Sequence, residues 1–74
     1  MNIQELGKKL HDMYFKSEDG EAVAMIHLFA IKYADEILAS GESMRTIAST
    51  ANIQESYGTE ISKGVKLAKY VVPK

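Results

Sequence analysis

The stretch SMRTIASTANIQESYGTEISKG, residues 43–64, decides the fold of this chain. Its small apolar residues Ala48 and Ala51 predict one face of a short helix, and Ile61 predicts the buried face of a second helix. Between the two, Asn52 stands where a tight turn needs a left-handed backbone, which asparagine tolerates better than most residues. Helices that cross steeply through such a turn also need a small residue at the crossing, and Ala48 supplies it. The stretch therefore predicts a helix-turn-helix.

The remainder of the chain is also predicted to be helical. Proline is absent before Pro73, and no segment alternates apolar and polar residues over a length that suggests a strand. We predict four helices, which run from Asn2 to about Phe15, from Glu21 to Ala39, from Ser43 through Ala51, and from residues 54–56 to about Val71. The expected fold class is all-α, a compact four-helix domain with a C-terminal helix-turn-helix, and residues 1–74 form a single domain.

Local signals mark where these helices begin and end. Asn2 and Glu5 have the spacing of a capping box, Asp19 is a suitable N-cap for the second helix, and Gly41 suits the left-handed position after it. The residues expected in one shared core are Ala48, Ala51, Ile53, Ile61, Val65 and Ala68, packed against Ile26, Ala30, Tyr33 and Ile37.

Two glycines, Gly58 and Gly64, fall inside the last predicted helix, where each costs about 1 kcal/mol relative to alanine. Close approach of another helix is the structural interpretation of these glycines. Close approach of a ligand or a nucleic-acid backbone is the functional one.

Composition and motifs argue against several classes of function. The 74 residues are 46% apolar and 26% charged, as in ordinary globular proteins, and contain no cysteine for thiolate metal sites. His11 and His27 lie on different predicted helices, and His27 is expected to be a hydrogen-bonded core or boundary residue. No glycine-rich phosphate loop or serine paired with a base is present. We therefore predict no enzyme activity, catalytic residue, cofactor or metal ion.

The apolar run AVAMIHLFAI, residues 22–31, is about half the ~20 residues that a bilayer span requires. The N-terminus alternates polar and apolar residues and does not resemble a signal peptide. We therefore expect a cytoplasmic chain that does not enter a membrane.

Charge is distributed unevenly along the chain, although the net charge is only −1. Residues 1–42 carry four lysines against eight carboxylates, whereas residues 43–74 carry five cations against two carboxylates. The basic half is thus the half that contains the predicted helix-turn-helix, as DNA binding would require. A scatter of ordinary surface lysines explains the same distribution.

The helix-turn-helix prediction can be made residue-specific for double-stranded DNA. Exposed positions early in the second helix of such a motif reach base edges, and the first helix contacts phosphates. The expected base-reading positions are Gln54, Ser56, Tyr57, Thr59, Glu60 and Lys63. The expected phosphate contacts are Arg45, Thr46, Ser49, Lys66 and Lys69.

The carboxylates of Glu55 and Glu60 oppose this interpretation, since phosphates repel them. The alternative is a protein–protein interaction module, an adaptor that uses the same helices without binding DNA. A homodimer is a further expectation, because two copies present two helices to adjacent half-sites. The stripe of Leu6, Leu10 and Met13 on the first helix either forms the dimer surface or closes the core of the monomer.

Two segments, MIHLFAIKYADEI (residues 25–37) and SYGTEISKGVKLAKYV (residues 56–71), resemble a family of short stand-alone bacterial proteins known as HTH-like domain proteins. The resemblance spans most of the chain. It implies an all-helical fold with a C-terminal helix-turn-helix in a bacterial or mobile-element setting. It implies no catalytic residues and no particular target, since a shared fold does not by itself specify a function.

Overall fold

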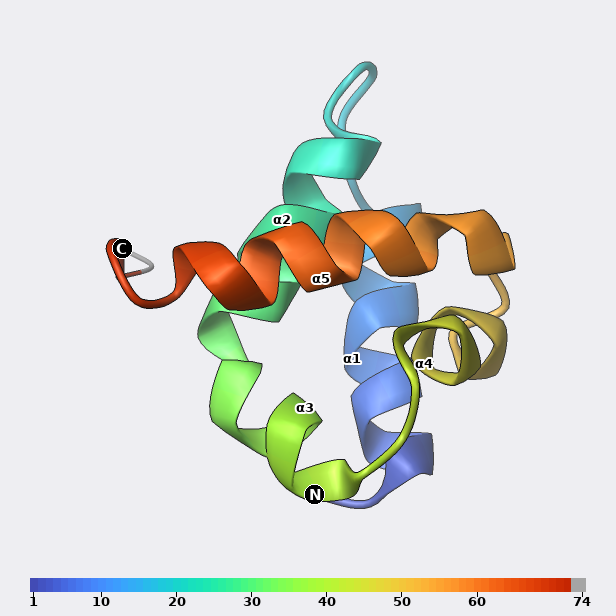
Figure 1. Ribbon diagram of the computed structural model, residues 1–74. Coiled ribbons are helices and arrows are strands. Elements are labelled where there is room, and N and C mark those ends of the chain that lie inside the picture. The colour runs from blue at the N-terminus through green and yellow to red at the C-terminus, as the bar shows by residue number, and fades with distance from the viewer. Residues whose placement is uncertain (73–74) are drawn as a thin grey trace.

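A computed structural model describes residues 1–72, and all regular structure in this range is helical (Figure 1). The elements are α1 (Ile3–Phe15), α2 (Ala22–Lys32), α3 (Ala34–Ser40), α4 (Met44–Thr50), the short 3-10 helix η1 (Glu55–Tyr57) and α5 (Gly58–Leu67). The Cα radius of gyration is 10.8 Å, close to the about 11 Å expected of a compact chain of this length. The predicted compact all-α class is confirmed.

The prediction of four helices was wrong at Tyr33, where the expected second helix divides into α2 and α3. Tyr33 has φ −111° and ψ 23°, well away from helical values. The bend allows Ala34 and Ile37 of α3 to face the core, whereas Leu38 turns outward and is 63% exposed. The domain described by residues 1–72 therefore contains five α-helices.

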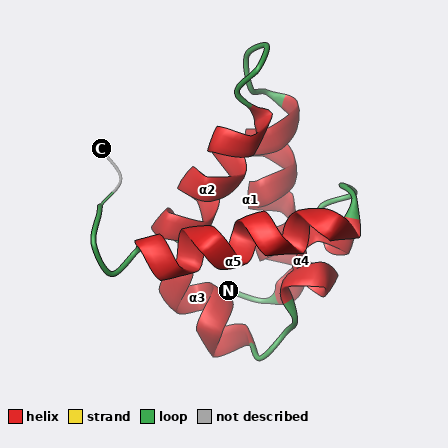
Figure 2. Ribbon diagram, turned by 45° about the horizontal axis from the view of Figure 1, so that its top comes forward, coloured by secondary structure: helices red, strands yellow, loops and turns green. Residues whose placement is uncertain are grey.

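The other α-helices are arranged around α5. Helices α1 and α2 lie side by side and are joined by a loop at one end of the molecule, while α5 crosses in front of α2 (Figures 1 and 2). Helices α3 and α4 lie on the other side of α5, and α4 also packs against α1. Helix α5 thus contacts α2, α3 and α4 and leaves one face uncovered.

Most of the expected core is buried. The hydrophobic core residues within the described range are Leu6, Leu10, Ile26, Phe29, Ala30, Ala34, Ile37, Ile47, Ala48, Ala51 and Ile61. Four expected members, Tyr33, Ile53, Val65 and Ala68, are only half-buried at its edge. Phe29 is not among the expected core residues, yet it is fully buried and its ring lies 5.5 Å from the ring of Tyr33.

Helix α1 belongs to this core. Leu6 and Leu10 have no exposed surface, and Met13 packs against them at the core edge. The stripe therefore closes the monomer, and the alternative of a dimer surface formed by these three residues was wrong.

Most of the predicted helix boundaries hold. The Asn2 side chain accepts a hydrogen bond from Glu5 N at 2.8 Å, which completes the capping box, and Gly41 has the left-handed φ of 69°. Asp19 was wrong as an N-cap, since α2 begins at Ala22 after Glu21 without a side-chain cap. The last helix was predicted to reach Val71 but ends at Leu67.

Candidate nucleic-acid interface

Helix α4 begins with a cap that fixes its direction. Ser43 Oγ accepts a hydrogen bond from Thr46 N at 3.1 Å and lies 2.9 Å from Thr46 Oγ1. Ile47 and Ala48 face the core, so Arg45 and Ser49 lie on the exposed face of the helix. The Thr46 hydroxyl is also exposed but is occupied by the cap, whereas the Arg45 side chain is 74% exposed.

The turn after α4 has the predicted left-handed residue. Asn52 has φ 62°, and it is the only non-glycine residue of the described range with a positive φ. The chain then reverses, and Ile53 N donates to Ala48 O at 3.1 Å. This geometry confirms the interpretation of Asn52 and positions the half-buried Ile53 against the core.

Two residues of α1, Gly7 and His11, contact the end of α4 and the start of this turn. His11 Nδ1 donates to Ala51 O at 2.9 Å, across forty positions of sequence. Gly7 lies so close to Thr50 that a Cβ atom there would stand 2.4 Å from Thr50 Cγ2. No local sequence pattern could indicate either contact, since both depend on how α1 packs against α4.

Helix α5 starts in direct contact with the backbone of α4. A Cβ atom added to Gly58 would lie 3.0 Å from Arg45 N and 3.1 Å from Met44 C. Further along, a Cβ atom on Gly64 would lie 2.5 Å from Ala30 Cβ and 2.8 Å from His27 O. Close helix approach, the structural interpretation of Gly58 and Gly64, is therefore confirmed.

The exposed face of α5 carries polar and basic side chains. Thr59, Lys63 and Lys66 follow one another at intervals of four and three residues, and all three are exposed. Gln54 and Ser56 are exposed just before the helix, and Thr59 Oγ1 donates to Ser56 O at 3.0 Å. The structure thus brings most of the predicted base-reading residues to the start of one helix.

Tyr57 differs from these residues because it is half-buried. Its ring lies 5.8 Å from the ring of Tyr14 on α1, and it packs against the core. Interaction with Tyr57, together with partial burial, raises the pKa of Tyr14 above its usual value. Tyr57 therefore connects the start of α5 to α1, and its ring is not displayed as the base-reading prediction required.

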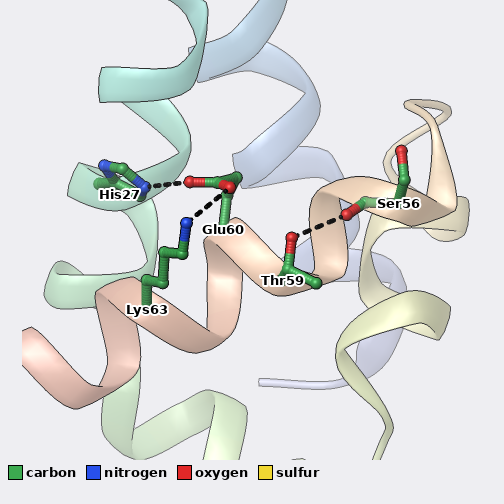
Figure 3. A network of polar contacts seen from close by, with 5 residues as sticks. All are labelled: His27, Ser56, Thr59, Glu60 and Lys63. Carbon is green, nitrogen blue, oxygen red and sulfur yellow. Dashed lines mark hydrogen bonds and ion pairs between the residues drawn. The ribbon is translucent and has the colours of Figure 1, made fainter.

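The carboxylate of Glu60 is bound by neighbouring side chains of the same chain. Its Oε1 accepts a hydrogen bond from His27 Nε2 of α2 at 2.7 Å, and its Oε2 lies 3.2 Å from Lys63 Nζ (Figure 3). The His27 hydrogen bond, and after it the Lys63 ammonium, lower the pKa of Glu60. His27 is therefore a hydrogen-bonded boundary residue, as expected, and Glu60 links α5 to α2.

The two remaining lysines of the prediction lie at the other end of α5. Lys66 is on the exposed stripe, and Lys69 follows the last turn of the helix. At the opposite end, the carboxylate of Glu55 lies 3.9 Å from Arg45 Nε, and both side chains are largely exposed. The predicted phosphate contacts therefore form two groups, one on α4 and one at the C-terminal end of α5.

Among residues 1–72 no helix is long and apolar enough to cross a membrane. In the same range no three His, Asp or Glu side chains gather to hold a metal ion.

Comparison with known proteins identifies the family. No curated protein and no solved structure matches the chain. The family model described as HTH-like domain matches residues 2–74, nearly the whole sequence. The geometry of α4, the Asn52 turn and α5 agrees with that description, and the chain belongs to the HTH-like domain family.

Proposed function

We propose that the chain binds double-stranded DNA through α4, the Asn52 turn and α5, and that it acts as a small transcriptional regulator. The observation that carries the proposal is the uncovered face of α5, which displays hydroxyl and ammonium groups next to the exposed Arg45 of α4. Such groups bond base edges and phosphates. Membership in the HTH-like domain family supports the same role.

The proposal gives the two helices different tasks. Base edges in the major groove are read by side chains that are exposed around the start of α5, namely those of Gln54, Ser56, Thr59 and Lys63. Arg45 on α4 contacts phosphate, since its backbone adjoins Gly58 at that same end of α5. Further phosphate contacts come from two residues of α4, Thr46 and Ser49, and from two lysines at the C-terminal end of α5, Lys66 and Lys69.

A titration of duplex DNA at several salt concentrations tests this function. Arg45→Ala should weaken binding about equally on all sequences and lower the salt slope by about one, because one phosphate contact is lost. Lys16→Ala, which removes an exposed charge at the end of α1, is the matched control and should leave the slope unchanged. No retention of random duplex at about 50 mM salt and about 100 µM protein would refute DNA binding, given non-specific constants of roughly 10⁻⁴–10⁻⁶ M.

Gln54 tests base reading separately. Its amide can bond adenine at two positions, so Gln54→Ala should reduce discrimination at one base pair by about 1–3 kcal/mol. Affinity for random duplex should change little. A preferred duplex obtained by selection from a random pool supplies the substrate for this comparison.

The second function is a protein adaptor, and the two ion pairs of this surface favour it. Arg45 faces Glu55, and Lys63 faces Glu60, so both cations already have a negative partner. Partnered cations attract phosphate less strongly. The adaptor proposal predicts that duplex binding stays at the weak background of any surface that carries lysines.

A further inference from the structure

An open groove with a volume of about 520 Å³ lies between α3 and α5. Its floor is apolar and consists of Ala34, Met44, Val65 and Ala68. It shares Lys66 with the exposed stripe of α5 but does not include Thr59 or Lys63. The groove is therefore separate from the base-reading positions of the proposed DNA interface.

The two walls of the groove carry opposite charge. On α3, Asp35 and Leu38 are three residues apart and form one edge, called here the α3 edge. On the opposite side, Lys66 and Lys69 form the α5 edge with the same spacing. Leu38 is 63% exposed, whereas sites for small molecules enclose most of the ligand surface. This groove suits a larger partner that covers Leu38.

We propose that the groove binds the α3 edge of a second copy of the chain and so forms a symmetric homodimer. A two-fold axis makes every contact reciprocal, so a surface that carries both an edge and its complementary groove satisfies the symmetry. Leu38 of each copy packs on the apolar floor of the other, against Met44, Val65 and Ala68. Asp35 of each copy faces Lys66 and Lys69 of the other, and the charges are complementary.

Formation of this dimer does not depend on DNA binding. It does change the role of Lys66 and Lys69, which contact a carboxylate in the dimer and so are less available to phosphate. The stripe from Thr59 to Lys63 stays uncovered, so a dimer can present two copies of α5 to a duplex.

Sedimentation equilibrium of the full chain tests the dimer without any DNA. We expect a reversible monomer–dimer equilibrium between about 1 µM and about 1 mM protein. Leu38→Asp should raise the dimer Kd by about tenfold or more, because it removes the central apolar contact. Leu38 is exposed in the monomer, so the far-UV circular dichroism of the variant should match that of the parent.

Charge exchange gives a second measurement, which remains informative if Leu38→Asp does not fold. Asp35→Lys should weaken the dimer, and the double variant Asp35→Lys with Lys69→Asp should restore it. Val23→Asp is the matched control, because Val23 is an exposed apolar residue at the start of α2, outside the groove. A monomer at about 1 mM, a double variant without restored affinity, or equal weakening by Val23→Asp would each overturn the proposal.

Discussion

At the scale of single residues, Asn52 is the position where backbone conformation restricts side-chain choice most. Its φ of 62° lies in the left-handed region, which costs most L-residues about 1–2 kcal/mol. Asn52→Ala should therefore lower the free energy of unfolding by about that amount, whereas Asn52→Gly should leave it nearly unchanged. Urea denaturation followed by circular dichroism measures both. Ser49→Ala, on the exposed face of α4, is the control, and equal stability of Asn52→Ala and the parent would contradict the strain argument.

The residue roles that were predicted correctly from the sequence are those that depend on neighbours in the chain. The Asn52 conformation and the pair of Asn2 with Glu5 depend on neighbours within four positions, and both were predicted correctly. His11 could not be assigned from the sequence, because its partner is a backbone carbonyl forty positions away. The half-buried position of Tyr57 was not predicted, because only the position of α1 shows that its ring packs on Tyr14.

At the scale of helices, the crossing of α2 and α5 depends on the absence of a side chain at Gly64. An added Cβ atom would lie 2.8 Å from His27 O, a backbone atom that cannot move without shifting α2. Gly64→Ala should therefore destabilise the fold by about 1–3 kcal/mol despite its better helix propensity. Gly58→Ala should cost less, because its nearest contact would be 3.0 Å. Thermal or urea unfolding that ranks the two variants in the reverse order would refute this account of the crossing.

The division between α2 and α3 marks the limit of prediction for whole elements. The segment from Glu21 to Ala39 contains no proline or glycine, so its pattern indicates one continuous helix. The bend at Tyr33 is favoured by the core, which accepts Ala34 and Ile37 from a different direction than Ala30. The groove beside Leu38 is a consequence of this bend and was therefore also absent from the sequence prediction.

At the scale of the molecule, the link from α2 to α5 through Glu60 makes stability depend on pH in acid. The pKa of Glu60 is lowered in the folded chain from an ordinary value of 4.5, so the unfolded chain binds more protons as the pH falls. The stabilisation that the charged Glu60 carboxylate provides is complete above pH 4.5 and is lost as the pH falls through the pKa of Glu60 in the folded chain. Glu60→Gln should accordingly lose less stability than the parent between about pH 5 and about pH 3.

Urea denaturation at each pH measures this slope. Glu18→Gln, which removes an exposed carboxylate of the loop between α1 and α2, serves as the matched control and should keep the slope of the parent. Superimposable curves for Glu60→Gln and the parent would show that the His27–Glu60 contact does not contribute to acid stability.

The residues that fix the position of α5 differ from those that it displays. Gly58, Ile61 and Gly64 face the neighbouring helices, while Thr59 and Lys63 face outward. Surface substitutions of the second kind usually change stability by less than about 0.5 kcal/mol. Descendants of one ancestral chain can therefore acquire new targets by exchanging outward side chains, while the same scaffold is inherited without change.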